Sequence, residues 1–428
     1  MRNLRTYLFP AAVCAALLLA LTAQVIADDV VRPEEVRSLR EVVYDRDTYN
    51  RLADMWKAYN EAYPSEFAYA NWMFATRYSG DKDYGELLAK GLKKYPANPK
   101  LLYLNAQRRA GSHDDRQAIQ DLEKAAALDK SFIDPWFDLI PRYMDAGDEG
   151  HLDLALRHVL ESGAITDEIM DYNYNMLIGL EPNAILITNG DNDTFPGWIL
   201  TRILQVRPDV TIINRALLNA EWYPLYTIAH GAPRFVNAAS LTKLREDVSK
   251  KLAETGAFSK MTPSGPYGDT LIQRIVESAD LAGRPVYLAR TIIVTDPLRD
   301  LIDHGRSLGL AIRVGQSDGN YVDQLQTVYG RWLHEFRTDG LRSWRLRYTG
   351  DSDAGRLLVA NYAYAIMADL AALRKLSPDP RVDLFHWYLA NMQPILPEMK
   401  QDHLARAWNR DASDIAEIQS WCAKQGLD

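Results

Sequence analysis

Three prolines at nearly regular intervals constrain the N-terminal part of this chain more than any other sequence feature. Pro64, Pro99 and Pro135 stand 35 and 36 residues apart, close to the period of about 34 residues of tetratricopeptide repeats, whose unit is a pair of helices. Each proline opens a helix-like stretch rich in Tyr, Leu and Trp. Second helices of the pairs are predicted over Tyr84–Lys94 and Arg116–Leu128.

Residues 28–165 are therefore expected to form tetratricopeptide-like helical repeats. A helix pair cannot bury its apolar face alone, so neighbouring pairs stack and leave a groove that suits a peptide or a partner helix. An irregular helical bundle, or a cap for the next domain, is the alternative. In either case Trp72, Tyr103 and Trp136 are expected in the core.

The pattern changes to alternating strands and helices after residue 180. The run Asn183–Asn189 is short and rich in apolar and β-branched residues, as in a buried parallel strand. A polar loop, a helix over Pro196–Val206 and a second strand over Val210–Asn214 complete a parallel β-loop-α-β unit. Further helices and strands are expected, in chain order, over 270–282, 285–289, 297–308 and 311–314. Residues 166–345 therefore predict a Rossmann-like open parallel sheet.

The C-terminal region, residues 346–428, returns to a helical pattern. Its stretch Leu357–Leu373 raises the question of a membrane span, but Asn361 and Asp369 favour a buried amphipathic helix. The fold class expected for the whole chain is α/β plus all-α, with helices on both sides of a central α/β domain.

The first 27 residues have the pattern of a secretory signal. Arg2 and Arg5 precede an apolar run, and a small-residue step ending at Ala27 precedes two aspartates. An uncleaved membrane anchor is the alternative, because the apolar run is at the short limit for spanning a bilayer. We expect a periplasmic or extracellular chain with no integral membrane span after cleavage.

The composition excludes several classes of protein. The formal net charge is −8, which disfavours a nucleic-acid partner. Hydrophobic residues make up 47% of the chain, with 10 Trp and 23 Tyr, so a packed core is expected and general disorder is not. Cys14 falls in the signal, which leaves Cys422 without an intrachain disulfide partner. No zinc motif, P-loop or GxGxxG element is present.

The polar stretch between the first predicted strand and its helix is the first candidate site. Open α/β proteins place ligand-binding loops at this position. Asp191 and Asp193, two apart in an extended loop, could share a divalent cation or sugar hydroxyls, and they are the candidate metal ligands. Asn189, Asn192 and Thr194 are further candidate ligand-binding residues. The alternatives are a structural loop, in which Asp193 or Thr194 caps the helix, and direct catalysis.

A second candidate cluster lies beyond the strand that begins at Val210 and is expected at the same edge of the sheet. An exposed Trp or Tyr there would stack on a sugar face, while polar neighbours bond its hydroxyls. For the aromatic residues the alternative is packing in the core. For Arg284 the alternative is a solvated position on the surface. The ligand-binding candidates of this cluster are Asn219, Glu221, Trp222 and Tyr223. Further ligand-binding candidates are Trp198 in the first predicted helix, Asn214 in the second strand and Arg284 before the third strand.

Four motifs in order resemble a known family. They are Asn-Gly-Asp-Asn-Asp-Thr-Phe-Pro at 189–196, Arg-Pro-Asp-Val at 207–210, Leu-Leu-Asn with Trp-Tyr within 217–223, and Arg-Pro-Val-Tyr at 284–287. Over about residues 180–375 the chain resembles the soluble C-terminal part of a bacterial membrane family, domain of unknown function 2723, similar to animal transmembrane protein O-mannosyltransferases. The resemblance implies an α/β-plus-repeat architecture and a link to exported glycoconjugates.

The same resemblance argues against transferase activity. That family's glycosyl transfer is attributed to a multi-pass membrane half, and its catalytic carboxylates have no counterpart in this sequence. We therefore expect an exported, non-catalytic accessory protein that binds an envelope polypeptide or a glycan. The alternative is a glycan-processing or sugar-transferring enzyme that uses Asp191 and Asp193 at a metal or sugar site.

Overall fold

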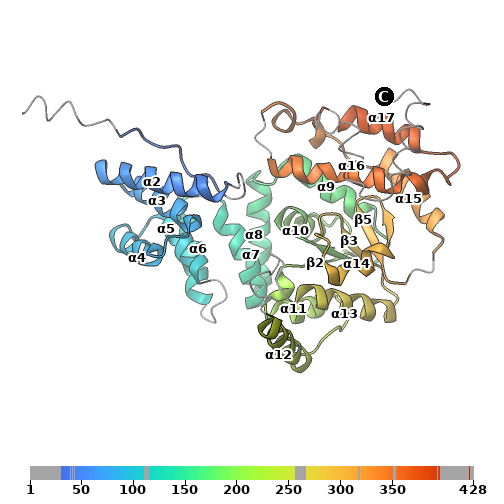
Figure 1. The fold of residues 1–428 in the computed structure, drawn as a ribbon, viewed down its shortest axis with the longest axis horizontal. Helices are drawn as coiled ribbons and strands as arrows, with labels where there is room; N and C mark the ends of the chain where they lie inside the picture. Colours follow the sequence, from blue (N-terminus) through green and yellow to red (C-terminus); the bar gives the residue numbers. More distant parts are fainter. Residues whose placement is uncertain are drawn as a thin grey trace, which may run out of the picture.

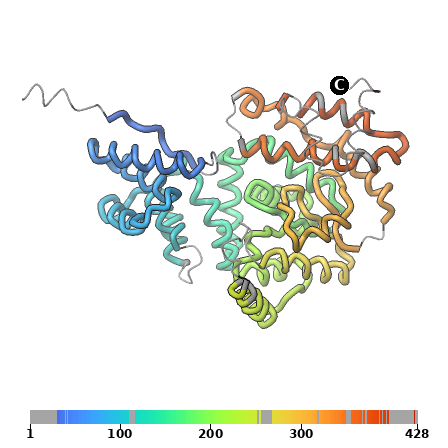
Figure 2. Tube along the Cα trace, in the orientation of Figure 1, coloured from blue at the N-terminus to red at the C-terminus, as the bar shows by residue number. Residues whose placement is uncertain are grey.

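A computed structural model describes residues 30–38, 40, 42, 44–109, 115–255, 267–316, 319–349, 353–392, 394–395 and 424. The predicted signal peptide and Cys422 lie outside the described residues. Within them, a helical arm stands on one side of an α/β body, and the last helices cover the top of that body (Figures 1 and 2).

The arm is built of helical hairpins with repeat-like packing, as the proline spacing predicts. Its helices are α2 (Arg46–Ala62), α3 (Glu66–Ser79), α4 (Tyr84–Lys94), α5 (Pro99–Arg108), α6 (Asp115–Leu128), α7 (Asp134–Ala146) and α8 (Glu149–Glu161). The predicted second helices are thus found within one residue of their expected bounds. Gly80 and Gly147 end α3 and α7 with left-handed φ angles of 81° and 65°, which residues with a side chain rarely adopt.

Large apolar side chains fill the space between these helices. Trp56 of α2 and Leu88 of α4 are fully buried, and Tyr103 of α5 is 6% exposed. Trp72 and Trp136 are partly buried and pack against the same core. Burial of such side chains contributes about 1.5–3 kcal/mol each, so the expected core positions stabilise the stack.

The central sheet has the order β2-β1-β3-β5-β4 and is mixed, although the sequence predicts a parallel one. Pairing is parallel between β1 and β2 and between β1 and β3, and antiparallel between β3 and β5 and between β5 and β4. The strands are β1 (Ile185–Thr188), β2 (Thr211–Asn214), β3 (Val286–Ala289), β4 (Arg306–Leu308) and β5 (Ala311–Val314).

A two-residue hairpin explains the antiparallel half of the sheet. Gly309, with φ of 65°, and Leu310 alone connect β4 to β5, and so short a connection joins only antiparallel strands. The helix expected over 297–308 ends at Asp303, and its last predicted turn is strand β4 instead. The structure therefore corrects the sequence prediction for this segment.

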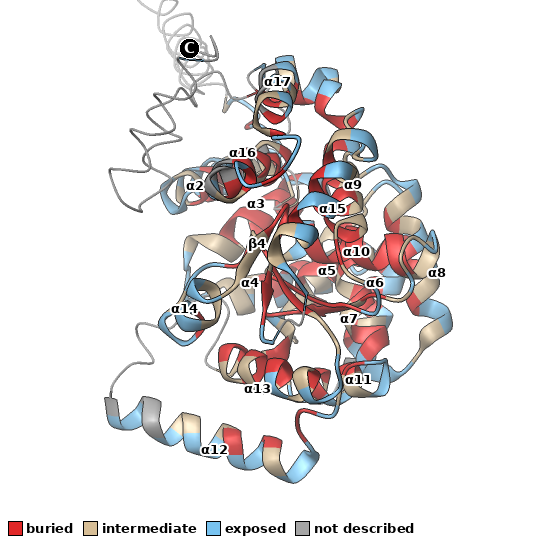
Figure 3. Cartoon of the chain, turned by 90° about the vertical axis from the view of Figure 1, so that its right-hand side faces the viewer, coloured by how far each residue is buried: buried red, intermediate tan, exposed pale blue. Residues whose placement is uncertain are grey.

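Helices cover both faces of the sheet. In Figures 1 and 3, α9, α15 and α16 lie above the strands while α11, α12 and α13 lie below them. Their bounds are α9 (Asp167–Ile178), α10 (Asp191–Trp198), α11 (Tyr223–Ala229), α12 (Ala238–Thr255), α13 (Gly268–Leu281), α14 (Asp296–Asp303), α15 (Tyr321–His334), α16 (Asp353–Leu373) and α17 (Arg381–Asn391).

Short turns of other helical types complete the body. Among the described residues, Ile199–Ile203 and Arg345–Thr349 are π-helical, and Leu217–Asn219 and Gly340–Arg342 are 3-10 helices. Among the helices that the structure describes, none combines the length and the apolar character needed to cross a membrane, and this includes α16.

Candidate functional site

The polar stretch predicted as a loop is the first turn of helix α10. The helix starts at Asp191, five residues before the predicted start at Pro196. The reason is a cap: the carboxylate of Asp193 accepts hydrogen bonds from the backbone N–H groups of Asn189 and Gly190, both at 2.8 Å. A carboxylate that folds back over a helix start in this way satisfies donors that have no partner within the helix.

Asp193 is enclosed by this arrangement. It is 1% exposed and also accepts a hydrogen bond from the hydroxyl of Thr291. Burial raises the pKa of Asp193, while the hydrogen bonds from Asn189, Thr291 and Gly190 oppose that rise. Both carboxylate oxygens of Asp193 therefore accept hydrogen bonds from within the fold. Asp191 projects differently, with a side chain that is 57% exposed, so the two predicted metal ligands have separate surroundings.

A proline within α10 is accommodated by a side chain from another helix. Pro196 has no N–H to donate to the carbonyl of Asn192, its partner four residues earlier. The amide of Asn173 in α9 donates to that carbonyl instead, at 2.8 Å. Asn173 is fully buried, so this contact joins α9 to α10 behind the sheet edge.

Three other predicted residues meet at the ends of β1 and β2. The Asn214 amide donates to the hydroxyl of Thr194 at 2.9 Å, and that hydroxyl lies 2.6 Å from the hydroxyl of Thr188. The backbone N–H of Asn214 donates to the phenol of Tyr223 at 3.0 Å. All four residues are buried. The sequence thus predicts correctly that these residues lie together. In the structure their polar groups are hydrogen-bonded to one another.

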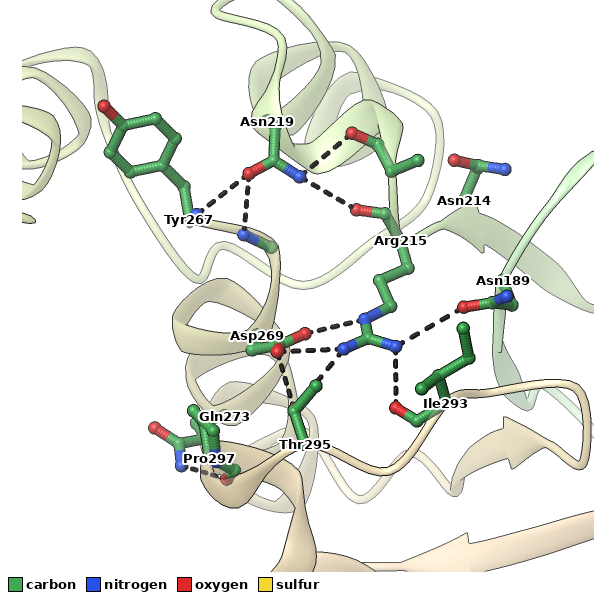
Figure 4. A network of polar contacts seen from close by, with 12 residues as sticks. Asn189, Asn214, Arg215, Asn219, Tyr267, Asp269, Gln273, Ile293, Thr295 and Pro297 are labelled. Carbon is green, nitrogen blue, oxygen red and sulfur yellow. Dashed lines mark hydrogen bonds and ion pairs between the residues drawn. The ribbon is translucent and has the colours of Figure 1, made fainter. Parts of the chain in front are cut away.

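The centre of this edge is an ion pair that the sequence analysis missed (Figure 4). Arg215 is fully buried and donates to both carboxylate oxygens of Asp269, at 2.7 and 2.9 Å. Its guanidinium also reaches the carbonyl of Ile293 at 2.9 Å and the side chain of Asn189 at 3.4 Å. Such two-pronged contacts fix the orientation of both side chains.

The side chain of Asn219 caps the start of helix α13. Its side-chain oxygen accepts from the backbone N–H groups of Tyr267 and Gly268, at 2.8 and 3.2 Å, at the start of α13 (Figure 4). Its amide donates to the carbonyl of Ala216 at 3.0 Å. The position where an open α/β protein often holds a ligand is therefore filled by side chains of the chain itself.

The remaining candidates take no part in these hydrogen bonds. Trp198 is in the core, and its indole N–H donates to the carbonyl of Ile212 at 3.4 Å. Trp222 is partly buried and packs edge-on against Tyr223. Glu221 is exposed.

Arg284 lies at the amino ends of the parallel strands, whereas Asp191 lies at their carboxyl ends. It precedes β3, and parallel strands place preceding residues at their amino ends. Its guanidinium donates to the carbonyl of Asn183 at 2.9 Å and to the hydroxyl of Thr211 at 3.0 Å. Burial lowers the pKa of Arg284. The structure therefore does not bring Arg284 to the other candidates.

Asp191 and Asn192 face a cavity at the junction of the arm and the body. This junction cavity has a volume of about 490 Å³, within the range of small-ligand sites. Its walls come from the segment before α2, the start of α7, the α8–α9 connection, the first turn of α10, and the region before and at the start of α16. The lining residues are Arg37, Ser38, Arg40, Ser131, Ile133, Asp134, Phe137, Ser162, Gly163, Ala164, Ile165, Thr166, Ile169, Asp191, Asn192, Arg345 and Ala354.

Arg40 links the candidate motif to the arm across this cavity. Its guanidinium donates to the carboxylate of Asp191, lies 4.0 Å from that of Asp138, and sits 4.1 Å above the ring of Phe137. Burial works against the charge, but the two carboxylates outweigh it and raise the pKa of Arg40. Within the described residues no group of three or more His, Cys, Asp or Glu side chains is arranged to hold a metal ion.

Part of the chain matches a known family model. A family model described as TMEM260-associated domain 2 matches residues 169–225. The matched stretch runs from α9 through β1, α10 and β2 into the start of α11, and it contains both Asp191 and Asp193. No curated protein matches the chain.

Proposed function

We propose that the chain is an exported, non-catalytic accessory protein that binds an envelope polypeptide or glycan in the junction cavity. The observation that carries the proposal is the division within α10. Asp193 and Thr194 turn inward and are engaged by the fold, whereas Asp191 and Asn192 open onto the cavity. The hydrogen bonds of Asp193 and Thr194 hold the first turn of α10 in place against the cavity. Such a fixed polar surface suits binding more than catalysis.

The family resemblance supports a role beside exported glycoconjugates. The match at 169–225 covers the turn that reaches the cavity, and the likeness to the soluble part of an O-mannosyltransferase-like family extends this to the rest of the α/β body. In this proposal the soluble unit acts as the recognition part of a glycan pathway in the periplasm or outside the cell.

A variant that fills the cavity tests the proposal. Ala164→Trp places a large ring in the cavity wall, and Ala229→Trp, at the exposed end of α11, is the matched control. Each mature, tagged chain is incubated with an extract of the envelope of its own cells. We expect one envelope protein or glycan to be retained by the original chain and the control and lost with Ala164→Trp. Retention that Ala164→Trp leaves unchanged would contradict the proposal.

A titration distinguishes the enzyme alternative. Calorimetry of the mature chain with Mn²⁺, Ca²⁺ and sugar nucleotides is expected to show no binding, because the carboxylate of Asp193 is enclosed and already accepts three hydrogen bonds. Metal-dependent binding of a sugar nucleotide that Asp191→Asn removes would show that the accessory role is wrong.

A further inference from the structure

A segment with neither helix nor strand crosses the helices of the arm. Residues 32–38, called the strap from here on, lie in the dark blue stretch that runs along the arm before α2 (Figure 2). Three side chains of the strap contact three helices of the arm, α3, α5 and α7. The pairs are the Arg32 guanidinium over the ring of Phe67 at 4.6 Å, the Glu35 carboxylate with the Lys100 ammonium at 2.5 Å, and the Ser38 hydroxyl with the Asp134 carboxylate at 2.7 Å.

These contacts recur every three residues along the strap. An extended chain advances about 3.1–3.4 Å per residue, so three residues cover about 10 Å. Packed helices stand about 8–10 Å apart, and α3 contacts α5 as α5 contacts α7. The strap therefore advances by one helix of this row with every three residues. Any polypeptide in an extended conformation would match the same spacing.

Two buried side chains of the arm hold the strap by its backbone. The side-chain oxygen of Asn71 accepts from the backbone N–H of Val36 at 3.1 Å. The indole N–H of Trp56 donates to the backbone carbonyl of Glu34 at 2.9 Å. Because these two hydrogen bonds use only the peptide backbone, they are available to a polypeptide of another sequence.

The side chains of the strap divide into an inner and an outer set. Pro33 and Val36 are buried, whereas Arg32, Glu34, Glu35 and Arg37 are exposed. The two buried positions are three residues apart, which is the period of the polyproline II conformation that many recognition peptides adopt. The strap thus has two apolar anchors, backbone hydrogen bonds and exposed charges, as a bound peptide has.

We propose that the arm surface beneath the strap is a binding site for an extended polypeptide, and that the strap occupies this site until a partner displaces it. The strap site is formed by Trp56, Phe67, Asn71, Lys100 and Asp134. The partner has an acidic residue directly before a small apolar residue, and a proline three residues before that apolar residue. The inference concerns the arm, so it does not require a ligand in the junction cavity.

The test is fluorescence anisotropy of a labelled synthetic peptide with the sequence of residues 30–40, titrated with the mature chain. The original chain should bind this peptide weakly, because its own tethered strap competes for the site. Val36→Asp puts a charge at a buried position and releases the strap, so it should tighten binding by about tenfold or more. Val31→Asp is the matched control, because Val31 is 78% exposed, and it should bind as weakly as the original chain.

A second strap variant covers the case in which Val36→Asp does not fold. Glu35→Lys changes an exposed side chain and places a cation opposite Lys100, so it should also release the strap and tighten binding of the peptide. Circular dichroism of each variant is compared with that of the original chain. Only variants with unchanged helical content are titrated.

A charge exchange locates the bound peptide. In the strap-released chain, Lys100→Glu should weaken binding of the peptide by about fivefold, the loss of one exposed ion pair and its replacement by repulsion. A peptide that carries Glu35→Lys should bind the Lys100→Glu chain better than the unchanged peptide does. Lys90→Glu, at an exposed position of α4, is the matched control and should change neither affinity.

Three results would overturn the inference. The first is a strap-released chain that keeps its helices and binds the peptide no better than the original chain. The second is peptide binding that Lys100→Glu leaves unchanged, since the peptide would then lie elsewhere. The third is an original chain that light scattering shows to be a dimer and that Val36→Asp makes monomeric, because the strap of a second copy would then be the occupant.

Discussion

Two arginine–aspartate pairs in this molecule serve opposite purposes. Arg215 and Asp269 are 0% and 9% exposed in their side chains and lie behind the sheet edge, while Arg40 and Asp191 are 22% and 57% exposed and line the junction cavity. The first pair is closed to solvent and braces the body. The second leaves part of its charge accessible to a ligand. Similar chemistry therefore stabilises the fold in one place and leaves a charged carboxylate exposed at the junction cavity in the other.

Removing the closed pair's cation should cause the largest effect. In Arg215→Met the carboxylate of Asp269 stays buried without its partner, which costs about 3–5 kcal/mol. Urea unfolding followed by circular dichroism measures this loss. The double variant Arg215→Met/Asp269→Leu should recover part of the stability, and a double variant no more stable than Arg215→Met would contradict a buried charge as the cause.

The cap at the start of α10 should rank second. Asp193→Ala leaves the N–H groups of Asn189 and Gly190 without their acceptor, for a loss of about 1–3 kcal/mol in the free energy of unfolding. Asp193→Asn keeps one acceptor oxygen and should lose less. An Asp193→Ala variant as stable as the original chain would contradict the role assigned to the cap.

Asp193 also predicts a dependence on pH. Burial raises its pKa in the folded chain above the ordinary carboxyl value, so the folded state holds this proton more tightly than the unfolded state. The resulting contribution is complete below the unfolded pKa and is lost as the pH rises through the folded pKa. Compared with Asp193→Asn, the original chain should lose stability between these two pKa values, as measured by unfolding at a series of pH values.

The contact across the helices should come third. Asn173→Ala removes the donor to the carbonyl of Asn192 and should cost about 1 kcal/mol, measured by thermal unfolding. Asn105→Ala is a control within the arm, where the amide bonds Asp121 instead. A loss confined to the arm variant would contradict the role assigned to Asn173.

The open pair should matter least for stability. Asp191→Asn is expected to change the free energy of unfolding by less than about 1 kcal/mol, because exposed ion pairs contribute little. It should instead reduce retention of the envelope component in the experiment that tests the proposed function. A loss of stability as large as that of Arg215→Met would erase the distinction between the two pairs.

The sequence predicted elements better than contacts. Apolar runs located β1, β2, β3 and β5 to within two residues, because a buried strand needs such a run. β4 was missed because three residues with Arg306 and Ser307 in them carry no strand pattern. The start of α10 was missed because Pro196 resembles a first-turn proline. A cap by Asp193 was one of the alternatives, but its acceptors for Asn189 and Gly190, which set the helix start at Asp191, are visible only in three dimensions.

The candidate site shows the same limit. Asp191 and Asp193 were found because they follow a strand, and Asn214 because it ends one. Arg215 was not, since its partner Asp269 is 54 residues away and no periodicity connects them. The junction cavity draws its walls from several distant segments. A short motif can therefore indicate one wall of such a cavity. The other walls can be recognised only when the three-dimensional fold is known.

The proline in α10 has a consequence for how this domain can vary among relatives. Asn173 supplies the hydrogen bond that Pro196 cannot, so we expect substitutions at the two positions to be coupled. A relative with an ordinary residue at 196 regains a backbone donor for the Asn192 carbonyl, and selection for an amide at 173 is relaxed. We expect the two positions to change together, so that paired substitution would trace this helix contact through the family.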